Sequence, residues 1–321
     1  MKNMNLEKMW DRLVYNGSSE FIFTRMDSVC IPELNLGLNS SLDRCLLLEL
    51  PKDHSVDFQT TVRQNLTLTF FKDTDYIVLQ LTDGTYYDLF NDLIISLYQK
   101  IYDLSNVAEY SKVFIQTFHK WSEFFEDEKT DRLTREIIKG LFGELLVLKS
   151  LVNSSSSSKI NDALNSWKGP YDQGHDFVLD DKIIEVKTKD ISKVEIGISS
   201  EYQLEKELDE KLELLVVSVE SEPVNGISIK DLIHEIKNSI IDKLGDCSIL
   251  LKAIRQKGLT YKNIPEYDNF KFKPINQIVY DCADDDFPKL VKSNTPDALN
   301  NIKYNIKISS LNKFIISEKE F

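Results

Sequence analysis

Between residues 19 and 95 the chain alternates short apolar runs with polar, turn-like stretches. The runs are FIFTRM, CLLLEL, TLTFF and YIVLQL, and the turn-like stretches are NLGLNSS, PKDHS and TDGTYY. Short β-prone runs bounded by Gly, Pro, Asn, Asp and Ser predict an antiparallel, β-rich region. Apolar residues at helical spacing predict a helix before this region, at about 5–15, and mainly helix after it, at 89–128.

The second half of the chain has a different pattern, in which helical and strand-like segments alternate. A helical pattern at 131–152 leads into the serine-rich stretch NSSSSSK at 153–159, which predicts a loop. The later segments are three strands, a helix from about Ser200, the strand ELLVVSVE, helices near 228–243 and 247–257, and the strands INQIVYDC and IKYNIKISS. This order predicts a mixed α/β unit.

The change of pattern near residue 125 predicts two domains in this chain of 321 residues. We expect a β-rich N-terminal domain with helices at 1–125. It shows no set of catalytic residues, so a binding or scaffold role is expected for it. The α/β domain at 126–321 is where we expect chemistry.

The chain is strongly acidic, with a formal net charge of −13 and a sequence pI of about 4.9. This charge opposes non-specific attraction to nucleic-acid phosphates, so DNA binding would need a local basic patch, a bound metal or a partner. The four cysteines and four histidines are scattered, which argues against structural zinc. No apolar stretch approaches the roughly 18 residues of a membrane span, and the charged N-terminus does not resemble a signal peptide. We therefore expect a cytoplasmic protein without a membrane partner.

Charged residues occur on what reads as a β-hairpin, GHDFVLDDKIIEVKTK, at 174–189. Side chains alternate faces along a strand. One face of the second strand would carry Ile184, Val186 and Thr188, and the other Ile183, Glu185, Lys187 and Lys189. Glu185 and Lys187 would therefore share a face.

A tight turn at 180–181 would place a second carboxylate beside Glu185. The expected pairs are Leu179 with Lys182, Val178 with Ile183, Phe177 with Ile184, and Asp176 with Glu185. Directly opposed residues have Cβ atoms roughly 4.5–5.5 Å apart, so two carboxylates there repel unless a cation lies between them. Lys187 and a divalent cation would serve, and oxygen ligands of this kind suit Mg²⁺ or Mn²⁺.

The helical pattern at 131–152 carries one carboxylate on or beside its apolar stripe. The stripe consists of Ile137, Leu141, Leu145 and Leu148. Glu144 lies at this stripe, whereas Glu136 and Lys139 fall on the polar side. An inward carboxylate is costly unless it is paired or bound to metal, so we expect Glu144 above the face that carries Glu185. Gly140 and Gly143 on the same helix predict close packing against the sheet.

These residues resemble the PD-(D/E)XK nuclease superfamily. Its pattern is a glutamate on a helix, an aspartate at the end of one strand and (D/E)-X-K on the next, matched here by Glu144, Asp176 and Glu185-Val186-Lys187. The usual proline before the aspartate is replaced by a histidine, a common departure. The stretches WKGPYDQGHDF, IIEVKTK, IGISSEYQL, DDFPKL and IKYNI also resemble bacterial proteins named "PD-(D/E)XK motif proteins". Genes of that family tend to neighbour restriction and phage-defence operons.

The resemblance implies an α/β (α+β overall) fold with a restriction-endonuclease-like core, a central mixed sheet flanked by helices. It implies that Mg²⁺, with Mn²⁺ as an alternative, is bound by Asp176, Glu185, the carbonyl oxygen of Val186 and Glu144. By the same resemblance Lys187 acts at the transition state, and we prefer an electrostatic role for it to that of a base. The catalytic residues would then be Glu144, Asp176, Glu185, Lys187 and Gln203.

Several residues near the hairpin have two readings. Gln203 falls where related nucleases carry a catalytic glutamine, but Ser200-x-x-Gln203 is also a capping box that begins a helix. Trp167 could stack on a base or pack in the core. His175 could touch a phosphate or be structural, and Lys189 could contact DNA. The densest basic stretch consists of Lys252, Arg255, Lys257 and Lys262. It could bind the phosphates of a nucleic acid, or it could be a solvated helix face.

The leading hypothesis is a Mg²⁺-dependent DNA endonuclease of a restriction-like, anti-phage defence system. A second hypothesis is a subunit of a larger assembly, in which the N-terminal domain docks a partner ATPase or methyltransferase and the nuclease is silent alone. A third is a structure-specific DNA-repair nuclease. A homodimer is also considered, and the sequence leaves DNA against RNA open.

Overall fold

The computed structural model forms two compact units, Met1–Lys129 and Thr130–Phe321, and each is described by itself. The boundary expected near residue 125 falls shortly before this division. The residues that the structure describes are 5–17, 19–52, 54, 56, 58, 60–127, 131–172, 174–206 and 210–321. Among them, no helix combines the length and the apolar character that a membrane span requires.

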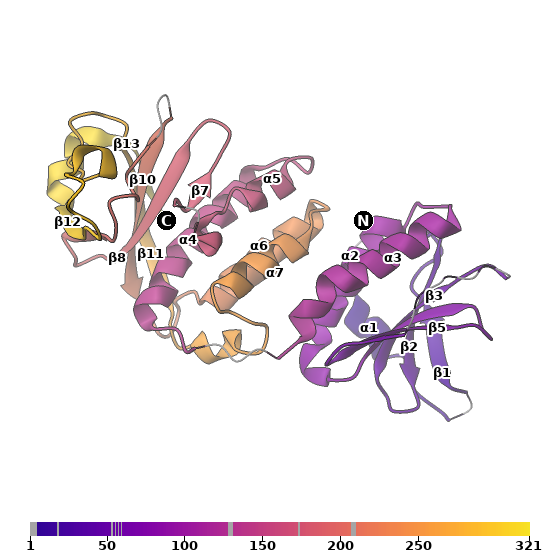
Figure 1. Cartoon of the computed structure of the whole chain (residues 1–321). Coiled ribbons are helices and arrows are strands. Elements are labelled where there is room, and N and C mark those ends of the chain that lie inside the picture. The colour runs from indigo at the N-terminus through magenta and orange to yellow at the C-terminus, as the bar shows by residue number, and fades with distance from the viewer. Residues whose placement is uncertain are drawn as a thin grey trace. The chain divides into compact units, whose positions relative to one another are not determined.

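The first unit contains a six-stranded sheet in the order β1-β2-β3-β6-β5-β4, and every strand pair is antiparallel. The strands are β1 (Phe21–Arg25), β2 (Glu33–Asn39), β3 (Arg44–Glu49), β4 (Thr61–Val62), β5 (Leu66–Phe71) and β6 (Tyr76–Leu81). The helices are α1 (Leu6–Trp10), α2 (Tyr87–Ile101) and α3 (Val107–Ser122), with 3₁₀ turns η1 (Gly84–Tyr86) and η2 (Glu123–Phe125). Helices α2 and α3 run side by side along the sheet (Figure 1). The predicted antiparallel, β-rich region is confirmed.

The second unit is built on a five-stranded mixed sheet in the order β13-β11-β10-β8-β7. These strands are β7 (Phe177–Val178), β8 (Ile183–Asp190), β10 (Leu212–Ser221), β11 (Phe272–Asp281) and β13 (Ile315–Glu320). Strands β8 and β10 are parallel, and the other neighbours are antiparallel. A separate pair consists of β9 (Glu195–Ile198) and β12 (Tyr304–Lys307). The sheet is flanked by helices, so the expected restriction-endonuclease-like architecture is confirmed (Figure 1).

The helices of the second unit are α4 (Arg135–Ser154), α5 (Ile160–Asn165), α6 (Ile229–Asp242) and α7 (Cys247–Gln256). Its 3₁₀ turns are η3 (Gly169–Tyr171), η4 (Ile264–Tyr267), η5 (Lys292–Asn294) and η6 (Ile308–Phe314). Helix α4 begins after Thr134, whose side chain accepts the N–H of Ile137, and it extends into the serine-rich stretch. Its other end is capped by Lys243, whose Nζ donates to the carbonyl oxygens of Val152, Asn153 and Ser155. Both ends of the helix that carries Glu144 are therefore held in place.

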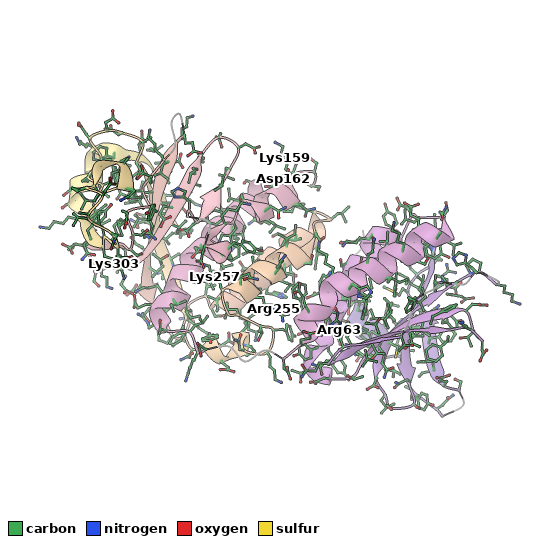
Figure 2. All side chains as sticks on the ribbon, in the orientation of Figure 1. Arg63, Lys159, Asp162, Arg255, Lys257 and Lys303 are labelled. Carbon is green, nitrogen blue, oxygen red and sulfur yellow. The ribbon has the colours of Figure 1, made fainter. Side chains whose placement is uncertain are left out.

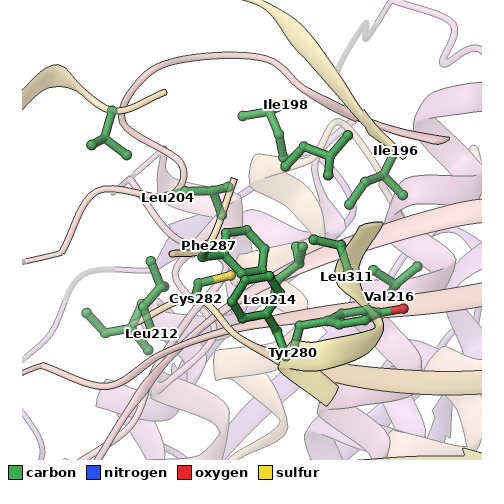
Figure 3. Packing of buried hydrophobic residues seen from close by; sticks show 14 residues of the cluster. Ile196, Ile198, Leu204, Leu212, Leu214, Val216, Tyr280, Cys282, Phe287 and Leu311 are labelled. Atoms are coloured by element: carbon green, nitrogen blue, oxygen red, sulfur yellow. The ribbon is translucent and has the colours of Figure 1, made fainter. Parts of the chain in front are cut away.

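The two faces of β8 have different coverings. On one face Thr188 lies against α4 and donates to the carbonyl oxygen of Gly140 at 3.4 Å. On the other face Ile183 joins a buried cluster with residues of β9–β12 and the C-terminal segment, shown in Figure 3. The labelled members are Ile196, Ile198, Leu204, Leu212, Leu214, Val216, Tyr280, Cys282, Phe287 and Leu311. By strand alternation, Glu185 and Lys187 lie on the face of this cluster.

Close packing of α4 depends on one of its two glycines. A Cβ added at Gly143 would lie 1.9 Å from Thr188 Oγ1, whereas a Cβ at Gly140 would meet nothing within 4 Å. The packing expected at both glycines is therefore found at Gly143 and is wrong for Gly140.

Lys139 was expected on the polar side of α4, but it is buried, with Nζ 2.7 Å from both Asp190 Oδ2 and Glu136 Oε2. Strand β8 extends to Asp190 and so supplies the partner that makes this burial tolerable.

Substituting these glycines gives opposite expected effects on stability. Gly143→Ala should lower the free energy of unfolding by about 1–3 kcal/mol, because the methyl group overlaps Thr188. Gly140→Ala is the matched control, and it should raise this free energy by up to about 1 kcal/mol through helix propensity alone. Urea unfolding of the two variants measures both values. Equal effects at the two positions would contradict the packing of α4 on β8.

Candidate functional site

The hairpin of β7 and β8 has the register expected from its sequence. The N–H of Leu179 donates to the carbonyl oxygen of Lys182 at 2.9 Å, closing the tight turn. Phe177 lies opposite Ile184, as the turn predicts. Asp176 precedes this paired stretch, so it lies at the open end of the hairpin.

Main-chain groups of two segments fix Asp176. Its carbonyl oxygen accepts the N–H groups of Lys168 and Gly169, at 2.7 and 3.0 Å. Its carboxylate oxygen Oδ2 accepts the N–H of Val186 at 2.8 Å. Because all these donors belong to the backbone, the position of the carboxylate does not depend on a mobile side chain.

Glu185, Lys187 and Gln203 form a connected group on one face of β8. Lys187 Nζ donates to Glu185 Oε1 at 2.8 Å and to Gln203 Oε1 at 3.0 Å. The same Gln203 oxygen accepts the N–H of Ser199 at 2.9 Å. The structure thus brings Gln203 to the predicted Glu-x-Lys pair. Glu185 is 2% exposed, so this ion pair is shielded from water.

The helix predicted from Ser200 is wrong, because residues 201–204 form turns. A capping box would have the Gln203 side chain accept the N–H of Ser200 itself. Instead this side chain accepts the N–H of Ser199 and the ammonium of Lys187. The half-buried Lys187 takes the side-chain oxygen of Gln203 as an acceptor, so this side chain does not cap a helix.

Glu144 is held between two donors and faces Asp176. Trp167 Nε1 donates to Glu144 Oε2 at 2.7 Å, and Lys257 Nζ lies 3.4 Å from Glu144 Oε1. A Cβ added at Gly169 would lie 2.7 Å from Glu144 Oε2 and 2.8 Å from Asp176 Oδ1. The two carboxylates therefore approach one another across the α-carbon of a glycine, where no side chain intervenes.

The placement of Glu144 differs from the expectation that it lies above Glu185. Its helix, α4, packs on the face of β8 that carries Thr188, and Glu185 lies on the other face with Lys187. Glu144 and Glu185 consequently come to Asp176 from opposite faces of the sheet. Sequence periodicity orients a residue on its own element but does not say which face of a sheet that element covers.

The site brings together more carboxyl groups than lysine side chains. Burial raises the pKa of Glu144, and the neighbouring Asp176 raises it further. Burial also raises the pKa of Asp176, and it raises that of Glu185 to about 8. The basic groups that act against these shifts are Lys187 and Lys257, with a smaller effect of His175 on Asp176. Three carboxyl groups, the buried Glu144 and Glu185 and the half-buried Asp176, lie near two lysine ammonium groups, and such an excess of carboxyl groups favours an added cation.

The chemical type of the donor atoms at this site suits a divalent cation. Carboxylate oxygens suit Mg²⁺ or Mn²⁺, and the space beside Gly169 separates Glu144 from Asp176. Among the described residues, however, no three Asp, Glu, His or Cys side chains are grouped so that together they could hold a metal ion. Glu185 is instead directed to Lys187 at 2.8 Å.

Trp167 packs in the hydrophobic core and contacts the site from there. It is 1% exposed, and its ring stacks on Phe177 with centroids 6.5 Å apart and an interplanar angle of 15°. The core-packing reading of this tryptophan therefore applies. Its indole N–H still has a specific role, because it holds one oxygen of Glu144.

His175 and Lys189 lie beside the hairpin with distinct surroundings. His175 is half-buried, its Nδ1 is buried without a hydrogen-bond partner, and burial lowers its pKa. Lys189 Nζ donates to the carbonyl oxygens of Ile191 and Lys193, at 3.5 and 2.9 Å. These two hydrogen bonds stabilise the turn that follows β8.

Two residues of the site were not singled out by sequence. Lys257 was grouped with a basic stretch, and Gly169 lies in the quoted stretch WKGPYDQGHDF. Figure 2 labels Lys257 and Arg255 at the end of α7. The basic stretch was the only signal for Lys257, and nothing in the sequence alone distinguished it from its neighbours.

A comparison of the sequence with protein families finds a match. A family model described as "Putative PD-(D/E)XK family member, (DUF4420)" matches residues 6–309, which is nearly the whole chain. No curated protein and no solved structure matches the chain.

Proposed function

The chain belongs to the DUF4420 family of PD-(D/E)XK proteins, and from that membership we propose that it is a divalent-metal-dependent DNA endonuclease. The observation that carries the proposal is the group formed by the buried Glu185 and the half-buried Asp176 and Lys187, with Glu144 and Gln203 attached to it. Carboxyl groups whose pKa values are raised by burial, beside a half-buried lysine, are costly to a fold and are typical of functional sites.

Each residue has a distinct part in the proposed hydrolysis. Asp176, Glu185 and the carbonyl oxygen of Val186 would hold Mg²⁺ or Mn²⁺, with Glu144 beside them. When bound, the ion would promote ionisation of a water molecule and stabilise charge on the attacked phosphate. Lys187 would neutralise the negative charge that grows on the phosphate oxygens as water attacks phosphorus and the sugar oxygen leaves.

Two neighbours would keep these groups in place. Gln203 accepts a hydrogen bond from Lys187 and so fixes the direction of its ammonium. Trp167 fixes Glu144 from the core. Both contacts come from side chains that are held by other parts of the second unit, which pre-organises the site.

The direct test is cleavage of supercoiled plasmid DNA by the purified protein. We expect nicked and linear products with Mg²⁺ or Mn²⁺ and none with a chelator. A single-stranded RNA and a single-stranded DNA of one sequence, assayed in parallel, decide between the two nucleic acids. Equal cleavage in the presence of chelator would contradict the metal dependence.

We also propose a biological setting, a restriction-like anti-phage system in which the chain works with a partner ATPase or methyltransferase. The net charge of −13 supports this second candidate, because an acidic chain gains little from DNA phosphates by itself. The first unit would dock the partner. Cleavage by the chain alone, as a monomer or homodimer, should then be weak and should rise when the products of adjacent genes are added.

Gly169→Ala tests the space between the two facing carboxylates. The added methyl group would lie within 2.8 Å of Glu144 Oε2 and Asp176 Oδ1 and would push them apart. We expect DNA cleavage to fall by about 10–100-fold with little change in unfolding temperature, because the displaced atoms are the ends of side chains. Gly197→Ala on β9, where the methyl group meets only Asn305 Oδ1 at 3.4 Å, is the control. Normal cleavage by Gly169→Ala would contradict the role of Glu144.

A further inference from the structure

Gln203 lies on a turn rather than on a helix or a strand, so other contacts must hold its side chain in place. Residues 201–204 form turns shortly after β9, and the N–H of Gln203 donates to the carbonyl oxygen of Ser200 at 3.4 Å. Oε1 of Gln203 accepts the N–H of Ser199 and the ammonium of Lys187, at 2.9 and 3.0 Å. Turns lack the regular backbone hydrogen bonds of a sheet, so the position of Gln203 depends on what this turn contacts.

The carboxylate of Glu201 connects this turn to a segment 101 positions later along the chain. Glu201 is buried, and its Oε2 accepts the N–H of Ile302 at 3.0 Å. Asn301, directly before Ile302, has a φ of 56°, a left-handed conformation that asparagine adopts readily. Hydrogen bonds from the N–H groups of Glu201 itself, Ile302 and Asn301 hold the pKa of this carboxyl below its usual value. The carboxylate is therefore ionised at neutral pH and is bound by backbone donors.

Two further contacts connect the same two parts of the chain. Leu204 is buried in the hydrophobic cluster of Figure 3, which also contains part of β12. Glu205 Oε2 accepts the N–H of Ser293 at 3.0 Å. Glu201 belongs to the turn itself and is buried, whereas Glu205 follows the turn and is half-buried. Of these two carboxylates, Glu201 is the one expected to set the conformation of the turn.

We propose that Glu201 is a positioning residue for the proposed hydrolysis. It fixes the turn at 201–204, the turn places Gln203, and Gln203 directs the ammonium of Lys187. The segment at 293–302 thereby supports the site, although it carries none of the predicted catalytic residues. This inference rests on the proposed function.

The rates of DNA cleavage by Glu201→Ala, Gln203→Leu and the double variant test this path. We expect Glu201→Ala to lower the rate at saturating DNA by about tenfold with little change in the KM for DNA, because Gln203 loses its fixed position. Adding Glu201→Ala to Gln203→Leu should change the rate by less than about twofold, since the group through which Glu201 acts is already absent. A merely structural role predicts instead that the two losses multiply.

Two variants serve as controls for charge and for the hydrogen bond. Glu195 Oε2 accepts the side-chain N–H of Asn305 at 3.5 Å, which is a contact between β9 and β12 outside the turn. Glu195→Ala changes the net charge by the same amount as Glu201→Ala, and it should cleave DNA at the natural rate. Glu201→Gln keeps an oxygen that can accept the N–H of Ile302, so it should retain about a third or more of the natural rate.

Amide hydrogen exchange at Ser199, followed by NMR without DNA or metal, reports on Gln203 directly. The N–H of Ser199 donates to Gln203 Oε1, so Glu201→Ala should speed its exchange by about tenfold. Glu195→Ala should leave this exchange unchanged. If Glu201→Ala does not fold, Glu201→Asp replaces it in both experiments, because it withdraws the carboxylate by one methylene group.

The two measurements distinguish failure of this inference from failure of the proposed function. The inference is overturned if Ser199 exchanges equally fast in Glu201→Ala and in the natural protein. It is also overturned if the rate losses of Glu201→Ala and Gln203→Leu multiply, and in that case the proposed function stands. A natural protein that cleaves no DNA overturns the proposed function, and exchange at Ser199 then still decides whether Glu201 places Gln203.

Discussion

Asp176→Asn is expected to lower DNA cleavage by about a thousandfold or more, which corresponds to about 4 kcal/mol in the activation barrier. Asparagine has nearly the same shape as aspartate, and its carbonyl oxygen can still accept the N–H of Val186. It removes the negative charge that a divalent cation requires. The rate of plasmid nicking under saturating Mg²⁺ measures the loss.

The same substitution should leave the metal-free protein at least as stable as before. Burial raises the pKa of Asp176, so its ionised form is less favourable in the folded chain than in the unfolded chain. A carboxyl group with a raised pKa loses stabilisation as the pH rises through that value, and a neutral side chain has no such loss. We therefore expect an equal or higher unfolding temperature at neutral pH for Asp176→Asn.

Asp172→Asn is the matched control for this prediction. Asp172 is exposed, lies in the same segment and has a φ of 52°, a left-handed conformation that asparagine adopts readily. It should cleave DNA at the natural rate. A loss of cleavage in Asp176→Asn accompanied by a fall in unfolding temperature would indicate a damaged fold and would contradict the assignment.

The parts of the site that depend on one element could be predicted from sequence. The hairpin follows from period-two alternation and a tight turn, and its register places Asp176 directly before the paired residues of β7. The helical position of Glu144 follows from the spacing of the leucines around it. These arguments need only the local geometry of one strand pair or one helix, which can be inferred from the order of the residues.

The parts that depend on packing between elements could not be predicted. Lys257 lies 113 positions from Glu144 along the chain, and only the fold of α7 brings the two together. The face that α4 covers is set by the fit of Gly143 against Thr188, a contact with no sequence signature of its own. The pattern Ser-x-x-Gln can begin a helix or supply an acceptor to a distant donor, and the half-buried Lys187 of β8 decides between the two.

Lys187 is expected to give the second large effect, and two substitutions distinguish its possible roles. Lys187→Met should lower the cleavage rate by about 100–1,000-fold, because it removes a charge directed at the phosphate. It also leaves Glu185, which is 2% exposed, without its ion-pair partner. Gln203→Leu should cost less, since Lys187 would keep its charge and lose one acceptor.

Lys187→Arg decides between electrostatic stabilisation and proton abstraction. A guanidinium group keeps the positive charge but does not lose its proton in proteins, so it cannot act as a base. An electrostatic role therefore predicts that the arginine variant retains about a tenth or more of the natural rate, the deficit reflecting its different shape. A role as base predicts that Lys187→Arg is as inactive as Lys187→Met across the neutral and alkaline range. Because Nζ of Lys187 donates hydrogen bonds to Glu185 Oε1 and Gln203 Oε1 and so has a fixed direction, we expect the first result.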